Sequence, residues 1–162
     1  MCIRDRQVTL SNLSLTGGAA QASGIDVGGA IYTLGTELTL ESVKINQNSA
    51  LTNGGGLFVD SGVVQLSNVD ILDNKSDGSG AGIYINDGLV SIDNTEISGN
   101  ETSLLQQGGG IFVNNGRVDS NDVIISDNFA TRGGGLYLRN GEFNALTTDL
   151  SLIHISEPTR PY

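Results

Sequence analysis

Residues 97–113 read ISGNETSLLQQGGGIFV and hold two short signatures that recur along the chain. The first is an isoleucine followed three residues later by an asparagine. The second is a glycine followed by an aliphatic, an aromatic and another aliphatic residue. Successive asparagines are 26, 26 and 28 residues apart, and a period of this length indicates a repeat architecture. The asparagines are Asn48, Asn74, Asn100 and Asn128, and the glycines are Gly56, Gly82, Gly110 and Gly135.

Each repeat predicts three short β-strands. In the second repeat they cover residues 38–40, 43–45 and 57–59, where apolar side chains alternate with other residues as in half-buried strands. Residues 48–56 carry Ser, Thr, Asn and Gly and predict a loop. No segment offers ten residues of helical periodicity, so helical repeat folds are excluded.

A single repeat of this kind cannot bury its apolar side chains, so the repeats must stack. Each strand then pairs in parallel with its copy one coil away, and such crossovers favour right-handed winding. We therefore predict an all-β fold: a right-handed single-stranded parallel β-helix (solenoid) of about five coils, each with three short strands and 25–28 residues. Two inward apolar columns are expected, formed by Leu57, Ile83, Ile111 and Leu136 and by Ile45, Ile71, Ile97 and Ile125.

The recurring Asn and Gly residues are predicted to be structural. An asparagine at a repeated corner bonds its local backbone, and amides stacked at strand spacing bond one another, which predicts a ladder of Asn48, Asn74, Asn100 and Asn128. Gly56, Gly82, Gly110 and Gly135 are predicted at turns that need a positive φ or a close approach between coils. No Lys-Ser/Thr and no helix follow the glycine triplets, which argues against a phosphate-binding loop.

The two ends of the chain share no pattern with the repeats. Residues 1–6 and 150–162 hold the only Met, Cys and His residues and both prolines. Read back into codons, both resemble the mosaic end of a tagmentation transposon, in opposite orientations. We expect an adapter-like artefact at residues 1–6, parallel β-helix repeats at residues 7–149 that are a fragment of a longer solenoid, and a second adapter-like artefact at residues 150–162.

Composition restricts the chemistry. Eighteen acidic against eight basic residues give a net charge of −10, which disfavours a nucleic-acid partner. No apolar run approaches the roughly 20 residues that span a bilayer. Residues 7–149 contain neither Cys nor His, which excludes Cys-His and Ser-His-Asp catalysis and the usual zinc sites there. We predict no catalytic residue, no metal ligand and no cofactor.

Carboxylates are the remaining acid–base candidates. Asp70 and Glu96 occupy the same outward position on consecutive coils, and such a pair could share a proton, bind Ca²⁺ or act as a glycosidase pair. Lys44 and Ile124 stand in the same column, as on a variable solvated face. Asp70 and Glu96 are therefore interpreted as a surface carboxylate pair, most consistent with a solvated face.

The repeats resemble those of right-handed parallel β-helix surface proteins. Ile97-Ser98-Gly99-Asn100 and residues 108–113 are similar to the repeats of polymorphic outer-membrane proteins and autotransporter passengers, which pair an F-x-x-N-like motif with G-G-A-I. The resemblance implies export, an extracellular or cell-surface location and an outer-membrane anchor in a missing region. It also implies an adhesive or display role, with host or neighbour-cell surface glycans or proteins as partners.

Three functions remain open at this stage. The favoured one is a non-catalytic structural or adhesive segment of an exported bacterial surface protein, whose missing parts would stack on both ends. The alternative is a fragment of a pectate-lyase-like polysaccharide lyase or glycoside hydrolase, for which Arg117 and Asp119 are the nearest candidates, because fold does not decide function. The third is a spacer or cell-wall module. Coils that vary only from 25 to 28 residues favour the first.

Overall fold

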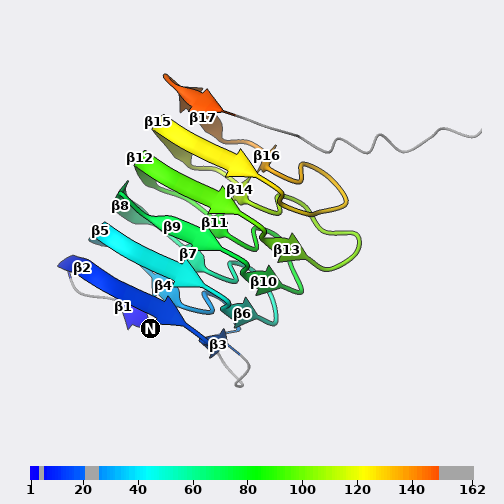
Figure 1. The fold of residues 1–162 in the computed structure, drawn as a ribbon, viewed down its shortest axis with the longest axis horizontal. Coiled ribbons are helices and arrows are strands. Elements are labelled where there is room, and N and C mark those ends of the chain that lie inside the picture. The colour runs from blue at the N-terminus through cyan, green and yellow to red at the C-terminus, as the bar shows by residue number, and fades with distance from the viewer. Residues whose placement is uncertain (4–5, 21–25, 150–162) are drawn as a thin grey trace, which may run out of the picture.

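The computed structural model describes residues 1–3, 6–20 and 26–149. Within these residues the chain is all-β, without a helix, and winds into about five stacked coils that form a parallel β-solenoid. Figure 1 shows the coils rising in chain order from the N-terminal strands to β17. The predicted fold class is confirmed.

The strands form three parallel sheets. We call the six-stranded sheet the aromatic sheet; its strands are β1 (Cys2–Ile3), β4 (Ile31–Thr33), β7 (Leu57–Val59), β11 (Ile83–Ile85), β14 (Ile111–Val113) and β16 (Leu136–Leu138). The eight-stranded bent sheet contains β2 (Gln7–Thr16), β5 (Thr36–Asn46), β8 (Gly62–Ser67), β9 (Asp70–Leu72), β12 (Leu89–Ser98), β15 (Arg117–Ser126), β17 (Glu142–Ala145) and β18 (Thr148–Asp149). The four-stranded short sheet contains β3 (Ala19–Ala20), β6 (Ser49–Ala50), β10 (Lys75–Ser76) and β13 (Glu101–Thr102).

Equivalent residues of successive coils pair in register. Ile71 pairs with Ile45 on one side, and Ile97 pairs with Ile71 and Ile125. All four of these side chains are at most 2% exposed. The second predicted column, Leu57, Ile83, Ile111 and Leu136, is also in register in the aromatic sheet. Together they line the interior of the solenoid, with Leu136 packed against its edge.

The sheets divide each coil differently from the sequence-based strand assignment. The first two predicted strands belong to the same bent sheet, and in β5 they are continuous. The bend falls at a left-handed residue, such as Ser42 (φ 55°) or Asn94 (φ 44°), which turns the chain while both neighbouring segments stay paired. The third sheet arises inside the segment predicted as a loop, where Ser49 and Ala50 pair with the neighbouring coils.

The outer face of the aromatic sheet carries a column of stacked rings. The ring centroids of Phe58 and Tyr84 are 4.9 Å apart and those of Tyr84 and Phe112 are 4.8 Å apart, with interplanar angles of 5° and 9°. Tyr32 and Tyr137 extend the column at its ends. Phe112 is only 1% exposed. The column therefore adds apolar burial outside the main core.

One repeat is longer than its neighbours, and the extra length lies in a surface loop. Asn100 and Asn128 are 28 residues apart, and the added residues fall between β13 and β14. Leu104 and Leu105 are 78% and 84% exposed there. The core register continues unchanged on both sides of the loop because loops absorb insertions without disturbing the paired strands.

The segments predicted to be adapter-derived are described only in part. Cys2 and Ile3 form β1, which pairs with Tyr32 and Thr33, and Ile3 is 3% exposed. Residues 4–5 and 150–162 lie outside the described residues. The adapter origin of both segments stays a prediction from the sequence. The described part of the chain contains no helix with the length and apolarity needed to cross a membrane.

Candidate functional site

The predicted asparagines lie directly above one another in the interior. The Nδ2 atom of Asn48 donates to Oδ1 of Asn74 at 3.0 Å, that of Asn74 to Asn100 at 3.0 Å, and that of Asn100 to Asn128 at 2.9 Å. Each receiving oxygen also accepts the backbone N–H of the preceding asparagine, at 3.0 Å in all three cases. All four side chains are buried, so the ladder satisfies polar groups that water does not reach.

The ladder also reaches backward along the stack. Asn74 Nδ2 donates to the carbonyl oxygen of Ile45, and Asn100 Nδ2 donates to that of Ile71. At the first coil the equivalent residue is Gly18, which has no side-chain amide. Its backbone N–H donates to Asn48 Oδ1 at 2.8 Å. Every amide in the ladder is thus committed to the backbone or to a neighbouring amide, which assigns the column to holding coils together.

The repeated glycines make room for this ladder. A Cβ atom on Gly56 would lie 2.7 Å from the carbonyl oxygen of Gly82 and 3.2 Å from Nδ2 of Asn74. A Cβ atom on Gly82 would lie 2.5 Å from the carbonyl oxygen of Gly110. Gly110 is in the same situation, whereas a Cβ atom on Gly135, in the last repeat, would meet only Ile125, at 3.2 Å. Close approach between coils therefore explains the first three glycines of the column.

Asp70 and Glu96 are paired residues of adjacent strands, as their spacing predicts. Each carboxylate has another partner. Asp70 Oδ2 lies 3.7 Å from Lys44 Nζ, and Glu96 Oε1 accepts a 2.8 Å hydrogen bond from Ser98. Ile124 pairs with Glu96 on the far side and is 49% exposed. The pair thus lies on a solvated outer face among residues of mixed chemistry.

A second polar column runs beside the aromatic rings. Asn86 Nδ2 donates to Asp60 Oδ1 at 2.8 Å, Asn114 Nδ2 donates to Asn86 Oδ1 at 3.1 Å, and Arg139 donates to Asn114 at 3.5 Å. Arg139 also lies 5.6 Å from the centre of the Phe112 ring. Burial raises the pKa of Tyr84, and the nearby Arg139 charge partly opposes that rise.

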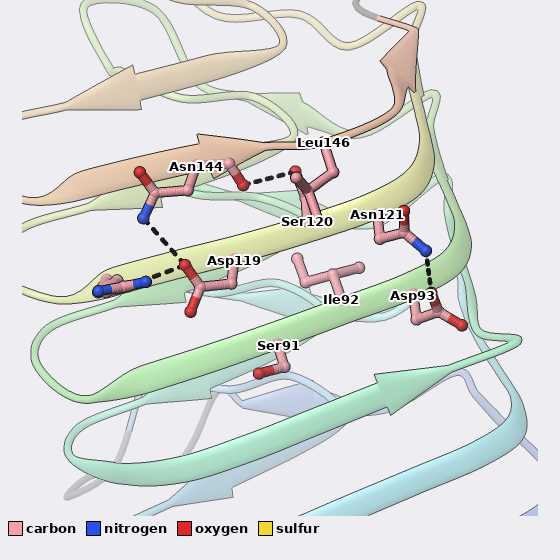
Figure 2. Close-up of a pocket in the computed structure, with 9 residues that line it drawn as sticks. Ser91, Ile92, Asp93, Asp119, Ser120, Asn121, Asn144 and Leu146 are labelled. Atoms are coloured by element: carbon pink, nitrogen blue, oxygen red, sulfur yellow. Dashed lines mark hydrogen bonds and ion pairs between the residues drawn. The ribbon is translucent and has the colours of Figure 1, made fainter.

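The hollow shown in Figure 2 lies on the bent sheet and has a volume of about 380 Å³. Arg117 Nε donates to Asp119 Oδ1 at 2.8 Å, and Asn144 Nδ2 donates to the same oxygen at 2.9 Å. These two hydrogen bonds lower the pKa of Asp119 below that of an ordinary aspartate, and the carboxylate in turn raises the pKa of Arg117. Asp119 is therefore held as an anion and is a poor proton donor near neutral pH.

The described residues contain no cluster of side chains that could bind a metal ion. No three His, Cys, Asp or Glu side chains there are placed to hold one ion. Hydrogen bonds that were not predicted from the sequence link the outer columns, such as that from Asn121 Nδ2 to Asp93 Oδ1 at 2.6 Å. Their sequence signal was the recurrence of short polar residues at matching positions of successive repeats.

The fold defines the chain as a parallel β-solenoid stabilised by an internal asparagine ladder. No family model matches it, and neither the curated proteins nor the solved structures that were searched contain a match.

Proposed function

We propose that this chain is a non-catalytic structural and adhesive segment of an exported bacterial surface protein. The observation that carries the proposal is the uninterrupted register of the coils, from Leu10 paired with Leu40 to Ile97 paired with Ile125. A rod that repeats one backbone unit is suited to spacing and display, because each coil contacts only its neighbours and its length is set by coil number.

The surface chemistry supports this function. The cations Lys44, Lys75 and Arg117 each lie within 4 Å of a carboxylate on the same surface, at 3.7, 3.0 and 2.8 Å. Exposed pairs of this kind contribute little to stability and are typical of a solvated protein surface. The acidic surface also keeps a repetitive chain soluble.

The proposed location is the cell surface, with an anchor supplied by a region outside this sequence. The similarity of the Ile-x-x-Asn and Gly-Gly-Gly-Ile-Phe-Val repeats to those of β-helix surface proteins supports that location. The same similarity supports glycans or proteins of host or neighbouring cells as partners, and further coils of the parent chain as neighbours at both ends.

One observation favours the enzyme alternative. Arg117 and Asp119 both line the hollow shown in Figure 2, and a guanidinium beside a carboxylate is a combination that polysaccharide-cleaving sites use. Their mutual hydrogen bond holds the two groups against each other on an exposed strand. A structural pair is the interpretation we favour.

The test uses the full chain coupled to beads, together with whole cells that express the parent gene. We expect the beads to adhere to cells, and antibodies against the chain to label intact cells. Incubation with neutral and acidic polysaccharides should release no reducing ends. Release of reducing or unsaturated ends that is lost in Asp119→Asn would overturn the proposal in favour of the enzyme.

A further inference from the structure

Three hollows lie on the outer face of the bent sheet. The first, of about 500 Å³, contains Asn12, Ser42 and Asn68 in its lining. The second, of about 300 Å³, shares Asn68 and continues to Asn94 and Asp122. The third, of about 380 Å³, lies beside the second. All three hollows are open to solvent, so a ligand would lie along the surface and would not be enclosed.

The first two hollows follow the left-handed bend of the sheet from coil to coil. Asn12, Ser42, Asn68, Asn94 and Asp122 have φ values between 44° and 55°, and all are exposed. A left-handed residue at the bend directs its side chain outward from the same corner in every coil. Five corner positions at a strand spacing of ~4.8 Å span about 19 Å, which suits an extended ligand lying along the rod. We call the first two hollows together the corner groove.

Amides and hydroxyls supply most of the polar groups in the corner groove. Asn68 Oδ1 accepts a hydrogen bond from Asn94 Nδ2, which leaves the second amide hydrogen of Asn94 and its oxygen directed to solvent. In the neighbouring third hollow, Asp119 Oδ1 accepts the hydrogen bonds from Arg117 and Asn144, and Asp119 Oδ2 is left to accept another donor. Adjacent donors and acceptors of this kind match the vicinal hydroxyls of sugars, which both donate and accept.

The charges of the side chains that line the hollows argue against an acidic ligand. The three hollows are lined by five carboxylates and two cations. Both cations, Lys44 and Arg117, are paired with carboxylates of the same lining. The lining therefore offers a polyanion no free cation and presents it with like charge. The carboxylates are Asp70, Asp93, Glu96, Asp119 and Asp122.

We propose that the corner groove binds a neutral polysaccharide chain lying along the solenoid axis. This inference rests on the adhesive function proposed above and names the ligand class for it. Contacts come from the corner amides and hydroxyls, coil after coil, and the neighbouring carboxylates exclude acidic glycans. Because each coil adds a similar set of contacts, affinity should rise with the length of the oligosaccharide.

The test measures binding of fluorescent neutral oligosaccharides (cello-, xylo-, manno- and malto-hexaoses and the matching trioses) and of polygalacturonate to the full chain. The variant is Asn68→Gly with Asn94→Gly, because glycine keeps the left-handed backbone while removing both amides. The control is Asn115→Ala, whose exposed amide lies outside the three linings and accepts a hydrogen bond from Asn140. Circular dichroism verifies that each variant remains folded.

We expect at least one neutral hexaose to bind, more tightly than its triose. The double variant should weaken that binding tenfold or more, the control should not change it, and polygalacturonate should not bind. The proposal is overturned if no neutral hexaose binds, if the double variant binds as well as the unmodified chain, or if polygalacturonate binds more tightly. Bead adhesion to cells is scored separately. If the beads adhere to cells but the oligosaccharide measurements contradict the groove proposal, the adhesive function is retained and the groove proposal is rejected.

Discussion

Asn74 ties together three coils of the solenoid through a single side-chain amide. Its Nδ2 atom donates to Oδ1 of Asn100, 26 residues later, and to the carbonyl oxygen of Ile45, 29 residues earlier, both at 3.0 Å. Its Oδ1 atom accepts from the backbone and the side chain of Asn48. Such a buried and fully bonded amide fixes the vertical register, because any slip of one coil leaves several polar groups unpaired.

Asn74→Ala should therefore be strongly destabilising. It leaves the backbone N–H of Asn48 and the carbonyl oxygen of Ile45 without these partners in a buried site, which costs about 3 kcal/mol of unfolding free energy. Urea denaturation followed by circular dichroism measures the loss. Asn115→Ala, at an exposed position, should change stability by less than about 0.5 kcal/mol. Equal losses in the two variants would contradict the structural role of the ladder.

Gly82→Ala tests the close approach between coils. The added Cβ atom meets the carbonyl oxygen of Gly110 at 2.5 Å and Asn100 Cγ at 3.1 Å, so the backbone has to move and the ladder is distorted. We expect loss of most of the folded population, seen as loss of the β-sheet signal. The matched variant is Gly35→Ala, whose nearest atom, Ser61 Oγ, is 3.8 Å away and whose φ of 63° costs about 1 kcal/mol. A milder effect at Gly82 than at Gly35 would be inconsistent with this packing.

Neighbouring residues of β12 test the assignment of inner and outer faces. Ile97→Asp places an unpaired charge at a position that is 0% exposed, and should abolish the cooperative unfolding transition. Glu96→Lys changes an exposed residue opposite Asp70, and should leave the midpoint of that transition nearly unchanged. Small and similar effects in both variants would show that the two faces are wrongly assigned.

The Arg117–Asp119 pair predicts a pH dependence that NMR titration can follow. The folded-state pKa of Asp119 is lowered by hydrogen bonds from Arg117 and Asn144. Its contribution to stability is therefore present above the unfolded-state pKa and is lost as the pH falls through the folded-state value. The pair is exposed, so this contribution is small. Arg117→Ala should raise the carboxyl titration midpoint; an unchanged midpoint would show that the hydrogen bond does not persist in solution.

The inward columns could be predicted from sequence because they recur at nearly constant spacing and contain only Ile and Leu. Ile45, Ile71, Ile97 and Ile125 recur with the ladder asparagines, and a three-residue strand that alternates inward and outward positions identifies its buried face. The paired position of Asp70 and Glu96 followed from the same register.

The bend and the short sheet were harder to predict from the sequence than the inward columns. The corner residues are Asn in three coils, Ser in one and Asp in one, because several short polar side chains tolerate the left-handed conformation, so the residue type is not constant. The strands of the short sheet have two residues each, too few to show a period. The corner groove depends on both the bend and the side chains that surround it, and it becomes visible only when the coils are stacked.

The most direct test of the stacked register is a pair of engineered cysteines on adjacent coils. In a Cys2→Ser background, Asp70→Cys with Glu96→Cys places the two Cα atoms about one strand spacing, ~4.8 Å, apart, within the range that a disulfide spans. Asp70→Cys with Ser98→Cys displaces the second cysteine by two residues and beyond that range. We expect near-complete oxidation of the first pair and little of the second, measured by mass spectrometry after alkylation. No disulfide in the first pair, or equal yields in both, would contradict the solenoid register on which the ladder and the groove depend.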